Sequence, residues 1–465
     1  MLLDGILVGV MTAVWLTNVP IAFISIIRFL KNREAFVGKD LRRIRNDPMI
    51  IFQITTRSAT RTPVVERGIN SIIKSCHKIK YVCYQIYVVT DDPNDLINLR
   101  DLDCKVLLVD KNFRTNAIKK GRALQYAVEH RRKTKQNQSE QWVFHMDDES
   151  YVTPQTVLSL LKAIREIPGL AFEGPIFYPL KFESANILTA LAESIRPFTC
   201  YDCVSQMKNQ QYMKTSPLHM HGSNLLVRSD VENSIGWNFG PTLAEDQMFG
   251  YQVYHLYGPS AIGWHGGILL EQPPLNMKDH FMQRRRWVLG SLQNIDKFPA
   301  IHKLKLFYKL LTYFMGFASG FVSTMLSFHI YLPLFFAMSY TLLNYRVGDN
   351  SIDVVGNLLR TLYSESTSHF FGNMGAFQFG IGSILLFSSM VWLLSYQVGL
   401  FLNLRYSKIA WSKRVVLHFQ TLVLCPILGL VETFPAFWTL IEYYAKTRTS
   451  KSGKNLVYDF YVINK

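Results

Sequence analysis

Cysteine is scarce in this chain of 465 residues: there are six, scattered between positions 76 and 425. So few and so widely spaced cysteines exclude a disulfide framework and are typical of a domain in a reducing compartment. Two of them, Cys200 and Cys203, form a C-x-x-C pair, with His219 and His221 downstream. Because no second well-spaced pair accompanies them, packed free thiols and a zinc site both stay open for these residues.

Charge is also scarce, since Asp, Glu, Lys and Arg make up 18% of the chain against 49% apolar residues. Residues 5–27, 310–345 and 373–404 contain almost only uncharged side chains, and a further apolar run, 415–441, is interrupted by two prolines and Glu432. The first stretch, at about 1.5 Å rise per residue, is long enough to cross a hydrocarbon core of about 30 Å. The composition therefore predicts an integral membrane protein.

The excess of positive charge, formally +16, gathers beside these apolar runs, at 28–45 and 403–414. Basic flanks of this kind mark the cytoplasmic ends of membrane spans. No DNA- or RNA-binding motif accompanies the charge, which argues against nucleic-acid binding. We expect an N-terminal anchor over 1–30 rather than a cleaved signal peptide, because the basic flank follows the apolar run instead of preceding it.

The remaining apolar runs predict an interfacial helix and a transmembrane segment in 303–345, a second segment in 373–404 and a transmembrane or re-entrant segment in 415–441. A basic tail, 446–465, would then lie in the cytosol. The protein is thus expected to be multi-pass, with its main domain on the cytosolic side. In a eukaryotic cell the membrane would be that of the endoplasmic reticulum or Golgi, and in a prokaryote the plasma membrane.

The main domain, 46–295, alternates short β-rich runs with helical patterns. Such alternation predicts an α/β fold with a parallel sheet and helices on both faces. The predicted strands are 49–55, 84–90, 105–110 and 141–147, and the predicted helices are 64–78, 116–133 and 154–166. Ligands of such sheets bind beyond the carboxyl ends of the strands, where several acidic clusters fall.

The first cluster, Asp147-Asp148-Glu149, directly follows the strand QWVFHM. Two carboxylates at i and i+2 in a tight turn can reach one ion, and hard oxygen ligands suit Mg²⁺ or Mn²⁺. Such an ion neutralises a diphosphate leaving group. The alternative is a solvated turn, but three consecutive acids directly after an apolar strand are uncommon as plain surface.

Two further acidic sites are weaker signals when each is taken alone. Asp91 follows the strand YQIYVV and can accept hydrogen bonds from a nucleotide base, although acids are ordinary in turns. Glu245 and Asp246 begin a helical run. There, one acid can act as the general base for an acceptor hydroxyl, or simply as a favourable helix N-terminal charge.

The last cluster is Gln283-Arg284-Arg285-Arg286-Trp287, immediately before the membrane segments. These arginines suit either a membrane surface or a diphosphate, and the tryptophan offers a flat face to a sugar. Lys120 and Arg122 form a smaller basic pair. One of them could approach the donor phosphates, or both could lie on a solvated helix face. The ordered set of acids and the Gln/Arg/Trp cluster is far more specific than any single member.

These motifs resemble those of glycosyltransferase family 2, which includes cellulose, chitin and hyaluronan synthases. Asp91, Asp147-x-Glu149, Glu245-Asp246 and Gln283-x-x-Arg286-Trp287 are similar to the family's D, DxD, (T/A)ED and QxxRW motifs. Glu149 replaces the second aspartate of DxD and keeps a carboxylate. The resemblance implies a GT-A type Rossmann-like domain and a reaction that inverts the anomeric centre.

A more detailed resemblance is to the egghead-type β-1,4-mannosyltransferases. Thr55-Thr56-Arg57 is similar to their Val-Thr-Arg, the stretch 114–126 to their RTxA…KxRALQY, and the ending 460–465 to their FYVVxK tail. The usual family segment Pro-x-x-Asn-Glu is absent here. This resemblance implies a GDP-mannose donor and a lipid-linked acceptor such as glucosylceramide, although the motifs alone leave a UDP-sugar open.

The resemblance also implies roles for individual residues, with Mn²⁺ or Mg²⁺ as cofactor. The nucleotide-sugar donor would be held by Thr56, Arg57, Asp91, Lys120 and Asp147, and the metal by Asp147 and Glu149. Asp246 would be the catalytic base. Glu245, Gln283, Arg286 and Trp287 would bind the acceptor or the diphosphate. No obligate protein partner is expected.

Two alternatives remain at this point. A processive polysaccharide synthase using a UDP-sugar shares the QxxRW motif, but secretion channels usually have more helices than the roughly four apolar segments seen here. A catalytically inactive sugar-binding scaffold in the membrane would bind the donor without metal-dependent turnover. A transporter is disfavoured by the weak polarity of the apolar segments.

Overall fold

The computed structural model describes residues 18–36, 38, 40–56, 62–213, 220–297, 320–321, 324 and 376–449. Several predictions therefore fall outside the described residues: most of the anchor, Arg57, His219, nearly all of 303–345 and most of the tail 446–465.

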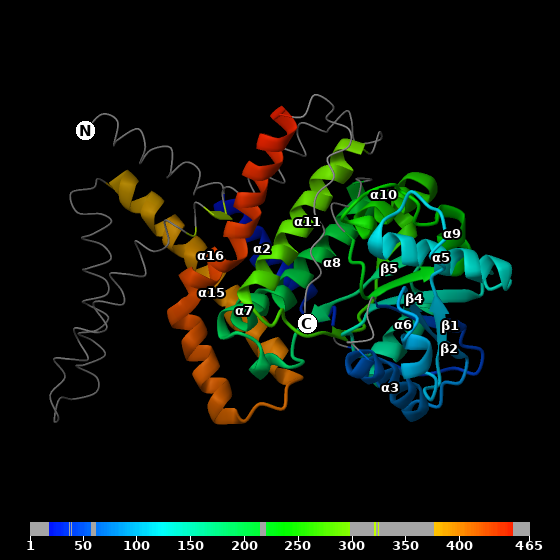
Figure 1. The fold of residues 1–465 in the computed structure, drawn as a ribbon. Coiled ribbons are helices and arrows are strands. Elements are labelled where there is room, and N and C mark those ends of the chain that lie inside the picture. Colours follow the sequence, from blue (N-terminus) through cyan, green and yellow to red (C-terminus); the bar gives the residue numbers. More distant parts are fainter. Residues whose placement is uncertain are drawn as a thin grey trace.

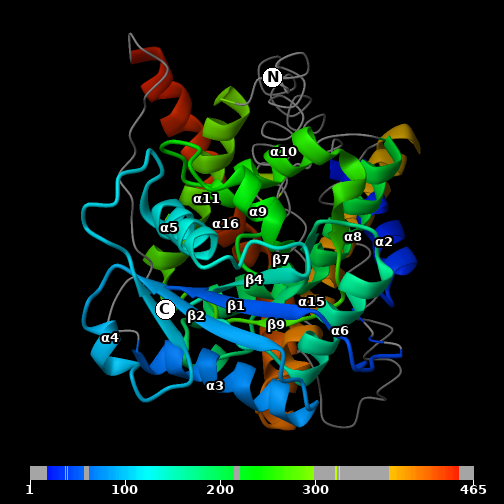
Figure 2. The same cartoon turned by 90° about the vertical axis from the view of Figure 1, so that its right-hand side faces the viewer.

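A seven-stranded sheet forms the centre of the main domain, with strand order β3-β2-β1-β4-β7-β5-β8. Figure 2 shows β2, β1, β4 and β7 side by side in this order. A separate two-stranded sheet pairs β6 with β9. The strands are β1 Met49–Thr55, β2 Tyr84–Thr90, β3 Lys105–Leu108, β4 Gln141–Asp147, β5 Ala171–Glu173, β6 Ile176–Phe177, β7 Leu225–Arg228, β8 Ile262–Trp264 and β9 Leu269–Leu270.

The predicted α/β fold is confirmed, but the sheet is mixed rather than wholly parallel. The first four strands are parallel neighbours, whereas β7 runs antiparallel to both β4 and β5. Three of the four predicted strands have the predicted bounds, and the third ends at Leu108 instead of residue 110. The sequence does not reveal the direction of β7 because a short buried apolar run looks the same in either orientation.

Both faces of the sheet are covered by helices, which Figure 2 shows with α3 (Thr62–Lys78) on one side and α5 (Lys119–Lys133) and α9 (Ser229–Ile235) on the other. Alternate residues of β1 explain this: Ile50, Phe52 and Ile54 join a core with α3 and α6 (Pro154–Glu166). Ile51 joins a second core with α5, α9 and α10 (Glu245–Tyr257). Successive strand side chains point to opposite faces, so a strand buried on both sides is mostly apolar.

The helices of the domain include those predicted at 154–166, which has the predicted bounds, and at 116–133, which begins later, at Lys119. The described helices up to residue 297 are α2 Asn18–Asn32, which precedes the domain, and then α3 Thr62–Lys78, α4 Asp95–Asn98, α5 Lys119–Lys133, α6 Pro154–Glu166, α7 Ile187–Ala192, α8 Arg196–Met213, α9 Ser229–Ile235, α10 Glu245–Tyr257 and α11 Met277–Lys297, with short 3₁₀ turns at Phe182–Ser184, Glu193–Ile195 and Pro259–Ala261.

Two long helices, α15 Ala376–Arg405 and α16 Trp411–Thr449, lie beside the domain (Figure 1). Within them, Phe387–Arg405 and Trp411–Lys446 are long and apolar enough to cross a membrane. α16 is one continuous helix through Pro426 and Pro435. Of the two alternatives for 415–441, this geometry favours a single segment over a re-entrant hairpin; the crossing itself stays a prediction.

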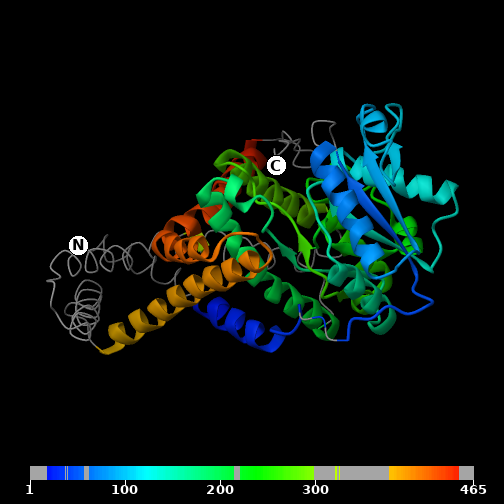
Figure 3. The same ribbon diagram turned by 90° about the horizontal axis from the view of Figure 1, so that it is seen from below.

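The long helices contact the domain through a few shared elements. α15 packs against α2 and α8, and α16 packs against α11 and α7. Figure 3 shows α2 running alongside α15, next to the sheet domain. α11, which carries the Gln/Arg/Trp cluster, is thus one of the direct links between the domain and α16.

Candidate active site

The candidate site lies at the edge of the sheet where β1, β2 and β4 end. Thr55 of β1 pairs laterally with Asp147 of β4 and Val89 of β2. The three strands are parallel, so the residues that follow them emerge at this one edge. Asp147 is the last residue of β4, and its side chain is 33% exposed, so it is accessible to a ligand while held by the sheet.

Lys120 provides the cation of the site. Its Nζ lies 2.5 Å from Asp147 Oδ1 and donates to the carbonyl oxygen of Gly222 at 3.1 Å. Lys120 is in the first turn of α5, whose preceding residue Ile118 is extended, so the chain enters the helix directly at the sheet edge. The side chain therefore joins the end of β4 to the segment before β7.

Gly222 also brings the second acidic motif to the same place. A Cβ at Gly222 would lie 2.7 Å from Asp246 Oδ2 and 3.2 Å from its Cγ, so any larger residue here would force this carboxylate to shift. On the other side, a Cβ at Gly121 would lie 3.7 Å from the Cβ of Glu245. Lys120, Asp147 and Asp246, all of them predicted site residues, thus lie at one edge of the sheet, with Gly222 against Asp246 and Gly121 against Glu245.

The charges at this edge are coupled. Burial raises the pKa of Glu245 to about 7, with Asp246 adding to the rise while Lys120 opposes it. Burial likewise raises the pKa of Asp246, and Lys120 again opposes the change. Burial lowers the pKa of Lys120, but Asp147, Glu245 and Asp246 outweigh it and leave that pKa above its ordinary value. Both carboxyls of the pair Glu245–Asp246 therefore bind a proton more readily than an ordinary carboxyl.

α11 is pressed against the start of α10. A Cβ at Gly290 would lie 2.6 Å from the backbone nitrogen and the Cβ of Ala244, the residue before Glu245. One turn further on, Asn294 donates to the carbonyl of Ala244 at 2.7 Å and accepts from Thr242 Oγ1 at 2.6 Å. α11 thereby fixes the start of α10, which carries Glu245 and Asp246.

The same face of α11 carries the Gln/Arg/Trp motif, because positions 283, 286, 287, 290 and 294 recur at helical spacing. Arg286 lies close enough to Glu245 and Asp246 to lower the pKa of both, against the effect of burial. The Trp287 ring lies 4.6 Å from the Arg196 guanidinium carbon and 4.5 Å from that of Arg284. Gln283 is 3% exposed and accepts from Arg284 Nη1 at 2.8 Å.

The other two acids after β4 point to different partners. Asp148 is 5% exposed and accepts a hydrogen bond from Thr56 Oγ1 at 3.1 Å, which joins the ends of β4 and β1. Glu149 is 2% exposed, and its carbonyl accepts from Arg67 Nη2 at 3.1 Å. Burial lowers the pKa of Arg67, and the Glu149 carboxylate opposes this change. Thr56 thus holds the acidic turn in place through its hydrogen bond to Asp148.

Asp91 is exposed at the end of β2. The neighbouring Thr90 hydroxyl donates to Asp95 Oδ2 at 2.5 Å and holds this turn. Burial raises the pKa of Asp95, and Asp91 and Asp92 contribute to the rise. Asp91 therefore lies in an acidic turn at the same sheet edge as Thr56 and Asp147, facing solvent. Arg122, in contrast, donates to the carbonyls of Asp110 and Lys111, outside this group.

Asp147 fits a divalent metal best among the predicted ligands. It is a partly exposed carboxylate, and the buried acids Glu245 and Asp246 act on the same Lys120, so a cation there would offset an excess of negative charge. Within the described part of the chain, two groups of three side chains are close enough to share an ion, and neither contains Asp147 or Glu149. Glu149 as a second ligand accordingly stays a prediction.

Two features of the site were missed from the sequence. The first is the segment Met220–Asn224: besides Gly222, its Ser223 hydroxyl donates to the buried Glu271 at 2.6 Å. The sequence contains one signal for this segment: a glycine between polar residues just before a short apolar run, which indicates a turn leading into a strand. The second is the role of Arg284, which neither the motif nor its spacing singles out.

Arg284 is the centre of a buried ionic network. It binds Glu432 of α16 through Nε at 2.9 Å and Nη2 at 2.8 Å, and Glu193 at 2.9 Å. His280 lies 3.3 Å from Glu193 and 3.5 Å from Glu432. The Gln/Arg/Trp motif is thereby fastened to a helix long and apolar enough to cross a membrane.

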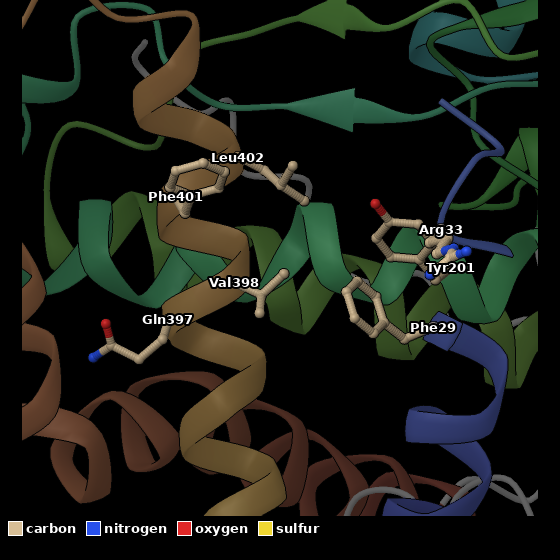
Figure 4. A pocket seen from close by; sticks show the side chains of 7 residues that line it. All are labelled: Phe29, Arg33, Tyr201, Gln397, Val398, Phe401 and Leu402. Atoms are coloured by element: carbon tan, nitrogen blue, oxygen red, sulfur yellow. The ribbon is translucent and has the colours of Figure 1, made fainter. Parts of the chain in front are cut away.

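A separate apolar cavity of about 390 Å³ lies between α2, α8 and α15 (Figure 4). Its walls include Phe29, Tyr201 and Phe401, with Arg33 and Gln397 as its polar members. None of its lining residues is one of the predicted site residues.

Comparison with known proteins places these observations in a family context. The model of the family described as "Glycosyl transferase family group 2" matches residues 142–345. This range begins in β4 and contains the acidic turn 147–149, Glu245–Asp246 and the cluster 283–287. The predicted resemblance to glycosyltransferase family 2 is thereby confirmed.

The resemblance to egghead-type enzymes is confirmed as well. The chain is 26% identical over 264 residues to β-1,4-mannosyltransferase egh of Drosophila melanogaster, covering 56% of each chain. It is 27% identical over 263 residues to β-1,4-mannosyltransferase bre-3 of Caenorhabditis elegans, covering 55% of each. The matched part thus spans little more than half the length of these relatives.

Among solved structures, the mannosyltransferase PcManGT from Pyrobaculum calidifontis, in complex with GDP-Man and Mn²⁺, aligns over 82% of this chain and 98% of its own. The TM-score is 0.41 and the identity 12%. Mannosyl-3-phosphoglycerate synthase from Rubrobacter xylanophilus covers 53% of this chain and 74% of its own, with a TM-score of 0.34 and 13% identity.

Proposed function

We propose that this chain is an inverting, metal-dependent glycosyltransferase that transfers mannose from GDP-mannose to a lipid-linked acceptor such as glucosylceramide, forming a β-1,4 linkage. The observation that carries the proposal is the meeting of Lys120, Asp147 and Asp246 at one edge of the sheet. The names of the two curated relatives support the mannosyl part and the linkage.

The donor lies across the ends of β1, β2 and β4 in this proposal. Asp91 and Thr56 flank the nucleoside, Arg57 assists, and Asp147 faces the diphosphate together with the metal. A bound Mn²⁺ or Mg²⁺ supplies neutralisation of the diphosphate charge as the glycosidic bond breaks. Lys120, already paired with Asp147, provides a second positive charge at the leaving group.

Asp246 is the general base. It takes the proton of the attacking acceptor hydroxyl while that oxygen bonds to the anomeric carbon from the side opposite the leaving diphosphate. One displacement of this kind inverts the anomeric centre, and it needs no carboxylate nucleophile. Burial raises the pKa of both Asp246 and the neighbouring Glu245, which makes Asp246 a stronger base than an ordinary aspartate.

The acceptor approaches along α11. Gln283, Arg286 and Trp287 lie on the face of this helix that meets the start of α10, and Arg284 ties the same helix to Glu432 of α16. An acceptor whose lipid part remains in the bilayer can therefore present its sugar hydroxyl to Asp246 from the membrane side. This arrangement supports a lipid-linked acceptor over a soluble one.

The test uses the full chain in detergent or nanodiscs with GDP-mannose, glucosylceramide and Mn²⁺. We expect one β-linked mannose per acceptor, read by mass spectrometry and by the anomeric coupling in NMR. Asp246→Asn is expected to lower kcat by about 10²–10⁴-fold while GDP binding is retained. Asp230→Asn, which alters a surface carboxylate paired with Arg228, serves as the control.

Several outcomes would count against the proposal. A polymer ladder from a UDP-sugar would identify a processive synthase instead. Donor binding without turnover, with or without Mn²⁺, would identify an inactive scaffold. Equal loss of GDP binding and turnover in Asp246→Asn would show that Asp246 is structural rather than catalytic.

A further inference from the structure

Three side chains from distant parts of the chain meet beside the candidate active site. They are Glu173 at the end of β5, Cys203 on α8 and His221 just before β7, and their ligand atoms all lie within 4.8 Å of one another. Glu173 is 0% exposed and Cys203 is 7% exposed. His221 Nδ1 lies 2.9 Å from Glu173 Oε1, and the His221 side chain, 17% exposed, leaves a way in from solvent.

The chemistry of this group matches one class of ion. A thiolate, an imidazole and a carboxylate are the ligand types of Zn²⁺, with bonds of about 2.0–2.3 Å, so two ligand atoms of one ion lie about 3.3–3.8 Å apart. Because the three atoms already lie within 4.8 Å of one another, side-chain adjustments alone can bring them to these separations. The charges also balance, because one carboxylate and one thiolate neutralise a divalent ion in a buried place.

Other residues near this group do not compete for the role. His265 is neutral and already engaged: burial lowers its pKa to about 4, Gly267 N–H donates to its Nδ1 at 3.2 Å, and its Nε2 lies 3.1 Å from the carbonyl of Asn224. Cys200, one turn before Cys203, is turned toward the carbonyl of Ile176 at 3.9 Å. These contacts leave Glu173, Cys203 and His221 as the ligand set.

The second group of three close side chains in the described part of the chain, Glu193, His280 and Glu432, is different. The guanidinium of Arg284 lies 2.9 Å from Glu193 and 2.8 Å from Glu432. A cation is thus already in place between these carboxylates, and the group is an ion-pair network rather than a metal site.

We propose that Glu173, Cys203 and His221 bind one Zn²⁺ ion, with water as the fourth ligand. The ion is separate from the metal proposed at Asp147, and this inference goes beyond the proposed glycosyltransferase activity. On binding, the Cys203 thiol releases its proton to water, and the sulfur, the imidazole nitrogen and a Glu173 oxygen each donate an electron pair to the metal.

The position of the ion gives it a definite structural effect. α8 is joined to α2 by hydrogen bonds from Ser25 to Asp202 and from Asn32 to Ser205, on either side of Cys203. His221 is next to Gly222, which contacts both Lys120 and Asp246. Zinc would therefore cross-link α8, to which α2 is hydrogen-bonded, to the backbone beside the proposed general base Asp246.

The first test is made on the unaltered full chain in detergent. The protein is stripped with a chelator, titrated with Co²⁺ and followed by absorption spectroscopy, because a cobalt–thiolate bond gives a near-ultraviolet charge-transfer band that oxygen ligands do not give. We expect the band to saturate at one Co²⁺ per chain and to disappear when Zn²⁺ is added. No thiolate band at saturating Co²⁺ would overturn the proposal, and this readout requires no variant to fold.

Variants then assign the ligands. Cys203→Ser and His221→Asn are expected to abolish tight zinc binding, measured by elemental analysis after gel filtration, and Cys203→Ser to remove the cobalt band. Cys200→Ser, a buried cysteine on the same helix, is the matched control and should retain both. This ligand set would be contradicted if Cys200→Ser and Cys203→Ser lost bound zinc and the cobalt band equally, or if Cys203→Ser kept its zinc. Asp147→Asn should leave the cobalt–thiolate band intact, which separates this site from the proposed catalytic metal.

Discussion

The backbone of Gly222 lies directly against the side chain of Asp246, and its carbonyl accepts a hydrogen bond from Lys120. A residue that no family motif includes therefore sets the distance between the proposed general base and the cation that pairs with Asp147. The segment before β7 is as much part of the site as the acidic turns themselves.

Gly222→Ala is expected to lower kcat by about 10²-fold, because the new Cβ would lie 2.7 Å from Asp246 Oδ2 and force that carboxylate to move. GDP-mannose affinity should change little. The control is Gly121→Ala in α5, where a Cβ would make only ordinary contacts of 3.5 Å or more and helix propensity favours alanine. Steady-state kinetics of both variants test the point; full activity of Gly222→Ala would disprove it.

Lys120→Met is expected to lower kcat/KM by about 10–100-fold, since a charge-assisted contact to Asp147 is lost. Lys120 also lowers the pKa of Glu245 and Asp246. Without it, the acid limb of the rate profile should move to higher pH, because the base must be deprotonated to act. Lys119→Met, at the exposed neighbouring position, is the comparison. An unshifted acid limb in Lys120→Met would refute the coupling.

The pH dependence follows from the pair Glu245–Asp246. Because burial raises the pKa of the proposed base Asp246, activity should begin to fall at a higher pH than it would with an ordinary aspartate as the base. Glu245→Gln removes one of the two close carboxyls, so the acid limb should move to lower pH. A profile that is identical in wild type and Glu245→Gln would show that the two acids titrate independently.

The same pair makes a prediction for stability. The folded protein keeps a proton on Glu245 up to about pH 7, whereas an unfolded glutamate loses it near its ordinary value of 4.5. The folded state thus binds more protons between these pH values, and the contribution of Glu245 to stability decreases as pH rises through this window. Thermal unfolding of the metal-free protein should show this slope, and Glu245→Gln should flatten it.

Arg284→Met is expected to destabilise the protein by about 3–5 kcal/mol, because it leaves Glu193 and Glu432 buried without their guanidinium. Burial raises the pKa of Glu193, but Arg284 and His280 outweigh it and keep that pKa below its ordinary value. Arg285→Met, which breaks a bridge to Glu442 at a more accessible position, should cost less. Equal unfolding midpoints for the two variants would contradict a special role for Arg284.

The core of the sheet could be predicted from sequence because its signal is local. The runs 49–55, 84–90 and 141–147 are mostly apolar and rich in β-branched and aromatic residues, and each forms a strand with those bounds. Asp91, Asp147 and Glu245–Asp246 were found for the same reason: each acid stands directly at the end of a strand or the start of a helix. Lys120 emerged from the family resemblance rather than from its charge.

Other relationships depend on contacts between residues far apart in the chain. Nothing near Gly290 indicates that it must be small, since the reason is the backbone of Ala244 across the interface. Three further relationships are of this kind. They are the direction of β7, the pairing of Arg284 rather than a neighbouring arginine with Glu432, and the proximity of Glu173, Cys203 and His221. Spacing along a helix tells which side chains share a face, but not what that face meets.

The sequence by itself determined which residues are apolar, which carry charge, and where strands and helices place their acids, because these follow from the preferences of each short segment. Only the tertiary structure decided which of these acids lie together and which cation stands between them. Those outcomes depend on packing across the sheet and on close backbone approaches at Gly222 and Gly290, which no local pattern encodes.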